Sequence, residues 1–314
     1  FQFSFSSFKS FPYEDCQNII NGIKLAKETI DAAKEMIVRL ANDEEQLKYQ
    51  YTARVHYNCA EIDNILVWVF CFGSAVTGFL GLSDMATLVL VVCFDLLGMF
   101  FGYLFGKNIE TAGMLRQVFD RRLFGMDLGL KAGDIDKLKE IVERTILKKR
   151  DDYNVQITNT GKDNPPGVRD WYTAPAMGRD GKDIVFQCQK ENVWFSKKMV
   201  YAKLAMNSVS LLIIVSIGIY AFRGKSLWEI IILAMSCMAL IVRFISRVKV
   251  LLEDFRASIV INTLVDNYRE MKQNKASILL QNAIEERRKL HLVYSSYAHS
   301  KMAHKLHELF QAMN

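Results

Sequence analysis

The sequence lacks the residue patterns on which most enzymes and metalloproteins depend. No P-loop, His-Glu-X-X-His, Gly-X-Ser-X-Gly or zinc-deaminase pattern occurs in its 314 residues, so we expect no catalytic residues, no cofactor and no enzyme. The six cysteines form no Cys-X-X-Cys pair, which argues against disulfides and favours soluble parts held in a reducing cytoplasm. His304 and His307 share a helical face, but no carboxylate or thiolate follows at matching spacing, so no metal is expected.

Charge is scarce over four long stretches, although the chain as a whole is 24% charged and 51% hydrophobic. The mean hydropathy of +0.07 therefore reflects apolar residues that are concentrated in blocks. A bilayer core about 30 Å thick needs roughly 20 apolar residues in a helix. Blocks of about this length are Asn64–Ser83, Met85–Gly106, Leu204–Phe222 and Ser226–Val242. Buried helices of a soluble protein are the alternative, but four blocks in two close pairs are hard to bury without lipid.

The turns between paired blocks are only a few residues long, so each pair is expected to form a hairpin with both outer ends on one side. Lysines and arginines flank the spans on that side, whereas the other side offers only Arg223 and Lys225. The positive-inside rule then places the N-terminus, the middle region and the C-terminus in the cytoplasm. The expected divisions are an N-terminal amphipathic helix (1–62), a first hairpin (63–106), a basic cytoplasmic domain (107–203), a second hairpin (204–245) and a C-terminal helical arm (246–314).

Small and acidic residues inside the first hairpin are the unusual features of the membrane region. Gly98, Gly102 and Gly106 are spaced by four and line one helix face, and Gly73 and Gly81 belong to a similar face on the first span. These faces sit at different depths, so we expect at least one to contact another hairpin or another subunit, the alternative being packing within the monomer.

Asp95 falls near the middle of the second span. A carboxylate at that depth is costly unless it is paired or wetted, which makes it a candidate for a functional site. One interpretation is that it lines a water-filled path or the interior of an oligomer. The other is a protonated side chain that bonds to Ser208 or Ser210 on the third span.

The cytoplasmic parts are predicted to be mainly helical, with a small α+β domain in the middle. Asn18–Tyr51 reads as one amphipathic helix, and Asp134–Arg150 as another with Asp134 as its N-cap. Tyr153–Thr158 and Asp183–Gln189 alternate well enough to be strands on either side of a proline- and glycine-rich stretch. The fold class is therefore mainly α: a four-transmembrane-helix protein of two hairpins with long helical N- and C-terminal arms.

Three short motifs in the middle region are distinctive enough to be compared with those of known families. Asp120–Met126 reads DRRLFGM, Asp170–Tyr172 reads DWY, and Phe186–Trp194 reads FQCQKENVW, in that order between the hairpins. Together with Tyr51–Arg54 and the Gln281–Arg288 segment, they resemble the SMODS-associated four-transmembrane effector family of bacteria. That resemblance implies anti-phage defence beside cyclic-oligonucleotide synthases in CBASS operons, and disruption of the inner membrane once an infection signal arrives.

The resemblance also implies a sensor for a cyclic oligonucleotide, and the central residue types suit one. Arginine and lysine bind phosphates, while aromatic rings stack on bases at about 1–3 kcal/mol each. The candidate ligand-binding residues are Arg121, Arg122, Arg169, Trp171, Tyr172, Gln189, Lys190 and Trp194. The alternative is that Trp171, Tyr172 and Trp194 form the core of the small domain, with Asp120 and Asp170 paired to arginines.

Three functions follow from these expectations. The first is a ligand-gated, membrane-permeabilising effector whose partners are the lipid bilayer, further copies of itself and a cyclic oligonucleotide, with no DNA or RNA polymer. The second is a constitutive channel or transporter, which usually has more polar residues on its spans than Asp95 alone. The third is a membrane scaffold that conducts nothing and recruits partners through its helical arms.

Overall fold

The computed structural model describes residues 35–77, 84–161, 163–172, 184–194, 196–197, 237–268 and 273–290, with isolated positions from 209 to 231. Its helices with defined bounds are α2 (Glu44–Thr77), α3 (Asp84–Leu123), α4 (Ala132–Lys148), α5 (Arg150–Thr158), α8 (Met238–Asp266) and α9 (Gln273–Arg288). Within these residues there is no strand, only one isolated bridge between Thr160 and Arg169. The mainly helical prediction is therefore confirmed.

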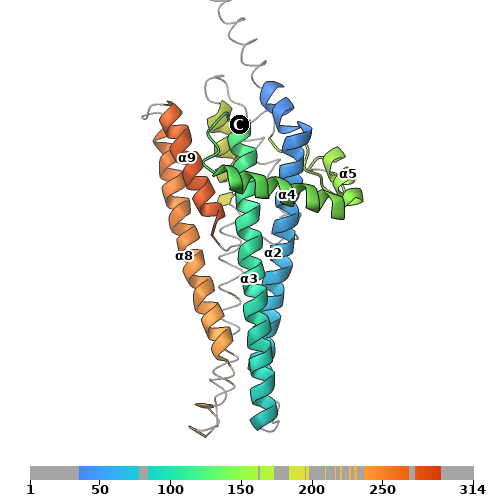
Figure 1. Ribbon diagram of the computed structural model, residues 1–314. Helices are drawn as coiled ribbons and strands as arrows, with labels where there is room; N and C mark the ends of the chain where they lie inside the picture. The colour runs from blue at the N-terminus through green and yellow to red at the C-terminus, as the bar shows by residue number, and fades with distance from the viewer. Residues whose placement is uncertain are drawn as a thin grey trace, which may run out of the picture.

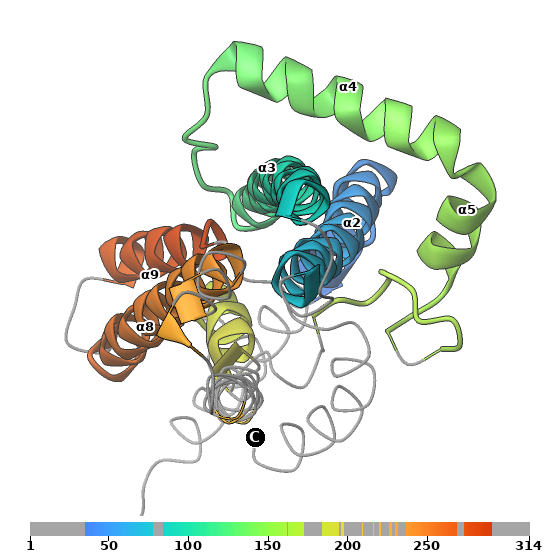
Figure 2. The same cartoon turned by 90° about the horizontal axis from the view of Figure 1, so that it is seen from below.

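Helices α2 and α3 form a long antiparallel hairpin, with α8 alongside it (Figures 1 and 2). Both hairpin helices are long and apolar enough to cross a membrane, as predicted for the first two spans. The apolar surface of α3 faces outward, with Met85 71%, Met99 72% and Tyr103 67% exposed. A core helix of a soluble protein would bury these side chains, so this surface suits contact with lipid.

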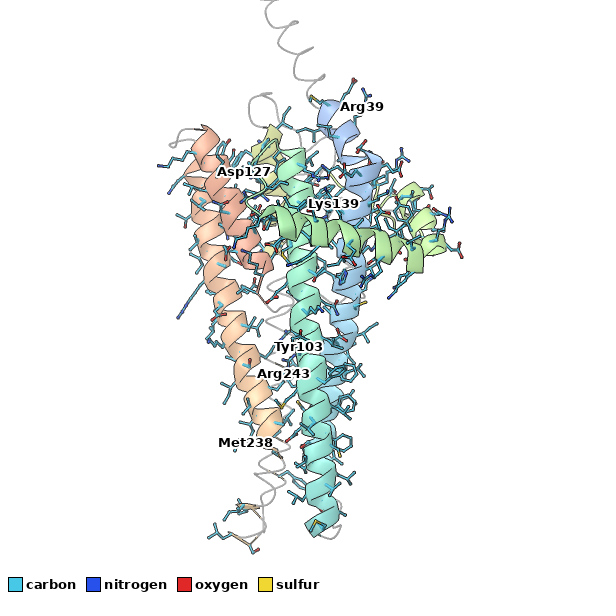
Figure 3. All side chains as sticks on the ribbon, viewed as in Figure 1. Arg39, Tyr103, Asp127, Lys139, Met238 and Arg243 are labelled. Atoms are coloured by element: carbon cyan, nitrogen blue, oxygen red, sulfur yellow. The ribbon has the colours of Figure 1, made fainter. Side chains whose placement is uncertain are left out.

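The polar and apolar parts of the molecule lie at opposite ends. Figure 3 shows nitrogen and oxygen atoms gathered around Arg39, Asp127 and Lys139, and mostly carbon along the far half of the hairpin. The predicted third span, Leu204–Phe222, lies outside the described residues except for isolated positions. Of the predicted fourth span, the last residues from Met238 onward begin α8.

Helix α3 reaches well beyond a membrane. Its 40 residues, at about 1.5 Å each, span about 60 Å, twice the thickness of a bilayer core. Its last turns, with Leu115, Val118 and Phe119 fully buried, form the main hydrophobic core together with the first turns of α2. The same helix thus belongs both to the apolar hairpin and to the main hydrophobic core at the polar end.

Helix α4 lies across α2 and α3 at the polar end (Figures 1 and 2). Leu138, Val142 and Ile146, at helical spacing, are buried in the main core. The predicted helix is confirmed, but its boundaries are not: it begins at Ala132 after the N-cap Lys131 and ends at Lys148. Asp134 lies in its first turn, where a carboxylate complements the helix dipole.

The two segments predicted as strands are helical instead. Helix α5 covers 153–158, where the amides of Tyr153 and Asn159 donate to carbonyls four residues earlier. Tyr153 packs edge-on against Tyr51 at 5.2 Å between ring centroids, while Val155 is 42% exposed, so the alternating residues do not share a buried face. Residues 184–194 are also helical. Ile184 and Cys188 are both buried, as expected for residues four apart on one helix face and not for alternating residues of a strand. The α+β prediction is wrong for these segments.

The predicted single helix over Asn18–Tyr51 is interrupted at its end. Residues 18–34 lie outside the described part, and the helix from residue 35 stops before Asn42. The side chain of Asn42 donates to Asp170 Oδ1 at 2.6 Å and accepts from the Asp170 amide at 3.0 Å. Asp43 Oδ2 accepts from the Glu45 amide at 3.2 Å and so caps α2. These side-chain bonds favour a break over a continuous helix.

Candidate functional site

The last turns of α3 hold a carboxylate at the centre of a polar cluster. Asp120 is fully buried, and its two oxygens are bound by different parts of the chain. Arg288 Nη1 of α9 donates to Oδ2 at 2.5 Å, and the hydroxyl of Tyr172 donates to Oδ1 at 3.0 Å. Asn192, from the helical segment 184–194, donates to the same Tyr172 oxygen at 2.9 Å. Asp120 therefore joins α3 to α9, to the central loop and to a further helix.

Opposite charges stabilise each other in this cluster. Burial alone would raise the pKa of Asp120, but the charges of Arg288 and Arg116 and the bonds from Arg288 and Tyr172 hold that pKa below its usual range. Burial works against the charge of Arg288, but Asp120 outweighs it and raises the pKa of Arg288. Burial, followed by the Asp120 charge, raises the pKa of Tyr172, so its hydroxyl stays a donor.

One arginine of α3, Arg121, is bound to α9 through a bidentate pair. Arg121 Nε and Nη2 each lie 2.8 Å from an oxygen of Glu285, and Nη2 also donates to Asn282 at 2.7 Å. Gln281 donates to Glu285 at 2.9 Å and accepts from Gln189 at 3.2 Å. Gln189 is fully buried and also donates to the Ser277 carbonyl at 2.9 Å. This row of side chains fixes one face of α9.

The other two arginines of α3 face α2. Arg122 donates to Glu45 at 2.6 Å and lies 4.9 Å from the ring centroid of Tyr49. Arg116 is buried, donates to Gln50 of α2, and lies 4.3 Å from the ring centroid of Trp171. Three of the four arginines described so far are thus held by carboxylates, and Arg116 by an amide and a ring.

The structure brings together several of the predicted ligand-binding residues, in a bonded rather than an open arrangement. Arg121, Tyr172 and Gln189 are linked through Asp120 and α9, and Trp171, 38% exposed, joins them through Arg116. The remaining predicted residues are placed as follows: Lys190 and Trp194 are half-buried on the 184–194 helix, Arg122 pairs with Glu45, and Arg169 is exposed on a loop.

Sequence reasoning missed the partners that α9 supplies. Arg288 and Glu285 lie more than 160 residues from Asp120 and Arg121, and a helical repeat does not reveal which residues meet over that separation. Pairing of Asp120 with an arginine was the alternative reading, and its partner is Arg288. Asp170, expected to pair with an arginine, bonds to Asn42 instead. The DRR motif and the Gln281–Arg288 segment, which both contributed to the resemblance, were the available signal.

Within the hairpin, two of the glycines allow close packing against phenylalanine side chains of the other helix. A Cβ at Gly73 would lie 3.3 Å from the ring of Phe94 on α3, and one at Gly98 would lie 3.8 Å from Phe70 on α2. Gly102 faces α8 across a cavity and has no atom within 4 Å of a Cβ built on it, so the predicted contact of this glycine face with another hairpin or subunit stays a prediction. Gly106 is a half-buried residue of α3, and Gly81 lies outside the described residues.

Asp95 is half-buried on α3, and its Oδ1 is buried without a hydrogen-bond partner among the described residues. The possible partners Ser208 and Ser210 lie outside those residues.

Comparison with known proteins identifies one family. A family model described as "SMODS-associating 4TM effector domain" matches residues 35–294, which is most of the chain and includes both α2 and α9. No curated protein and no solved structure matches.

Proposed function

This chain belongs to the SMODS-associating 4TM effector domain family, a group of membrane effectors, and we propose that it permeabilises the bacterial inner membrane in anti-phage defence of the CBASS type. In this proposal four helices cross the membrane, both termini are cytoplasmic, and the cytoplasmic part senses a cyclic oligonucleotide. The observation that carries the proposal is the length of α3. One helix runs from the apolar surface around Met99 to the buried cluster around Asp120, so a single rigid element would carry a shift from one end to the other.

The arginines of the cluster suggest how a signal would act. Arg121 is held by Glu285, and a phosphate offers the same bidentate acceptor geometry as a carboxylate. A cyclic oligonucleotide would therefore bind by replacing Glu285 on Arg121, and Glu45 on Arg122, while a base stacks on Trp171. Exchange at Arg121 removes one of the bonds that hold α9 on α3. The proposed switch is release of α9, followed by rearrangement of α3 and α8 in the membrane.

A regular apolar stripe on α8 supports assembly into a homo-oligomer. Large apolar residues recur at alternating steps of three and four, the spacing of a left-handed coiled-coil seam. They are Met238, Ile241, Ile245, Val248, Leu252, Phe255 and Ile259, and they are 37% to 63% exposed. Below, this set is called the α8 seam.

Contact with lipid explains the exposed apolar side chains in only part of the α8 seam. Arg287 of α9 pairs with Asp254 at 2.7 Å, so the half of α8 around Leu252, Phe255 and Ile259 lies beside the cytoplasmic helix α9. Apolar side chains exposed to water at helical spacing indicate a helical partner. A second copy of α8 fits, because each copy enters the membrane in the same orientation and presents the same seam.

Cross-linking tests this assembly. With the native cysteines replaced, Phe255→Cys is expected to form a disulfide between copies in membranes, since a seam residue faces its own counterpart in a parallel pair. Glu253→Cys is the matched control, because Glu253 lies off the seam. Equal cross-linking at both positions, or none at Phe255→Cys, contradicts the proposed interface.

Leakage of a fluorescent dye from liposomes tests the gating. The protein is expected to release dye when a cyclic oligonucleotide is added, and the Arg121→Gln variant to lose that response. Leakage without any ligand favours the constitutive channel, and no leakage under any condition favours the scaffold. Leakage that is unaffected by every cyclic oligonucleotide overturns the sensing step.

A further inference from the structure

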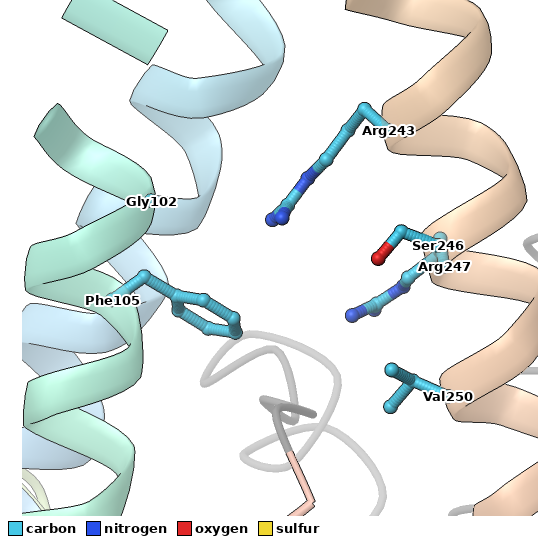
Figure 4. Close-up of a pocket in the computed structure, with 6 residues that line it drawn as sticks. All are labelled: Gly102, Phe105, Arg243, Ser246, Arg247 and Val250. Atoms are coloured by element: carbon cyan, nitrogen blue, oxygen red, sulfur yellow. The ribbon is translucent and has the colours of Figure 1, made fainter. Parts of the chain in front are cut away.

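A cavity of about 80 Å³ lies between the middle of α3 and the start of α8 (Figure 4). Gly102 and Phe105 of α3 form one wall. The opposite wall consists of Arg243, Ser246, Arg247 and Val250 of α8, and both arginine side chains extend from α8 towards α3. Gly102 leaves the cavity open, because a Cβ built on it would meet no atom within 4 Å.

The two arginines have donors left over. Arg243 donates from Nη2 to Asn64 Oδ1 at 2.9 Å, and its guanidinium lies 5.5 Å from the ring centroid of Phe105. The Nε atoms of both Arg243 and Arg247 are buried and have no hydrogen-bond partner among the described residues. Buried N–H groups are rarely left unbonded, because desolvation without a partner costs about 1–3 kcal/mol. The free donors point to a ligand that accepts hydrogen bonds.

The positive charge of the cavity is also uncompensated. No carboxylate lies within 4.0 Å of either arginine among the residues that the structure describes. Asp254, further along α8, already pairs with Arg287 at 2.7 Å. The sequence between Glu191 and Glu229, which includes the predicted third span, contains no Asp or Glu. Two neighbouring cations in a partly buried site repel each other unless an anion joins them.

We infer that this cavity binds the phosphodiester group of an anionic phospholipid from the cytoplasmic leaflet. Guanidinium groups match the oxygens of a phosphate through paired hydrogen bonds, and two of them supply the charge. The cavity lies at the cytoplasmic end of the predicted second and fourth spans, which is the depth of lipid headgroups.

The test compares lipids that differ in headgroup charge. The full-length protein is reconstituted in phosphatidylcholine vesicles, and the association of spin-labelled phosphatidylglycerol is measured relative to spin-labelled phosphatidylcholine. Measurement in about 1 M KCl, where the Debye length is about 3 Å, suppresses attraction to exposed cations. Arg243→Gln and Arg247→Gln are each expected to lower the preference for phosphatidylglycerol about fivefold.

Two further variants separate a bound headgroup from a general effect of charge or folding. Gly102→Leu fills the cavity while both arginines remain, and it is expected to remove the same preference. Lys249→Gln on the same helix removes a cation whose side chain is 76% exposed, and it is expected to change the preference less than about twofold. The inference is overturned if Lys249→Gln loses the preference for phosphatidylglycerol as strongly as the arginine variants do. It is also overturned if Gly102→Leu and Arg247→Gln both keep the full preference.

Soluble phosphates distinguish the lipid from another source of the same group. Glycerol 3-phosphate at millimolar concentration is expected to leave the phosphatidylglycerol preference unchanged, because a soluble phosphate lacks the acyl chains. Displacement by glycerol 3-phosphate would instead assign the cavity to an aqueous phosphate and overturn the lipid assignment. The measurement needs no signal and no leakage, so its result is independent of the proposed gating.

Discussion

Removal of the cation that neutralises Asp120 should release α9 from α3. Asp120 is fully buried, and Arg288 lies 2.5 Å from it with its side chain only 17% exposed. The Arg288→Met variant leaves the carboxylate buried with the Tyr172 hydroxyl bound to it and Arg116 nearby. Loss of one partner of a buried ion pair costs about 3–5 kcal/mol. The free energy for opening α9 should therefore fall by about that amount.

Hydrogen exchange of the α9 amides, in the protein reconstituted into nanodiscs, measures this opening directly. At 1.36 kcal/mol for each factor of ten, amides of Gln273–Arg288 should exchange about 10²- to 10⁴-fold faster in Arg288→Met. Amides in the middle of α3, around Phe100, serve as the internal control and should not change. The double variant Asp120→Asn/Arg288→Met removes both charges and should be about 2 kcal/mol less destabilised than Arg288→Met alone.

The pH dependence of α9 opening gives an independent test of the charge on Asp120. In the native protein the pKa of Asp120 is held low, so the stability that it contributes is complete at neutral pH and is lost only as pH falls through that lowered pKa. Without Arg288, burial dominates and raises the pKa of Asp120, so protonation becomes favourable in the folded state. Lowering the pH from 7 to 5 should therefore raise the protection factors of the α9 amides, which are corrected for the slower intrinsic exchange at low pH, in Arg288→Met but not in the double variant. A double variant that exchanges faster than Arg288→Met would refute this account of the cluster.

Other residues give simpler tests. Gly129 has φ of +63°, and a Cβ on it would lie 2.9 Å from Arg121 Nη1, so Gly129→Ala should lower the melting temperature, with a loss of about 1–3 kcal/mol. Burial raises the pKa of the Cys188 thiol and removes it from solvent, so maleimide at neutral pH should label it only after unfolding or in Arg288→Met. Asp95→Asn keeps the size of the side chain and removes the charge, so it should change the ion selectivity of any conductance while leaving assembly intact, as judged by cross-linking.

The sequence predicted the first hairpin well because lipid imposes a strict length and composition on a helix. Asn64–Thr77 and Met85–Gly106 lie within α2 and α3, where the apolar side chains remain exposed. The glycines at 73 and 98 also lie at helix contacts, but against Phe94 and Phe70. The spacing of small residues indicates that a second helix packs closely against that face. It does not indicate which side chain of the second helix lies against the glycine.

The polar end of the molecule was harder to predict, because short segments there fit both the period of a strand and that of a helix. Tyr153, Val155 and Ile157 alternate like a strand, yet no neighbouring strand is present in the described region to accept their backbone bonds. Arg121 has the side chain expected of a phosphate ligand, but its preference for a carboxylate is equally strong. Which anion it binds depends on the placement of Glu285, and that placement is set by packing of α9 rather than by local sequence.

The ion pairs on α9 also limit how a signal could act. Full switching of a two-state protein, from 1:99 to 99:1, needs about 5.5 kcal/mol of differential affinity. A ligand that only separated Arg121 from Glu285 would leave buried charges unpaired and would have to offset that cost as well. A ligand that supplies its own phosphate keeps Arg121 paired, and Glu285 is hydrated once α9 leaves. At Arg121, exchange of one anion for another therefore needs less binding energy than disruption of the pair does, and it explains why a signal-binding arginine would be paired in the resting protein.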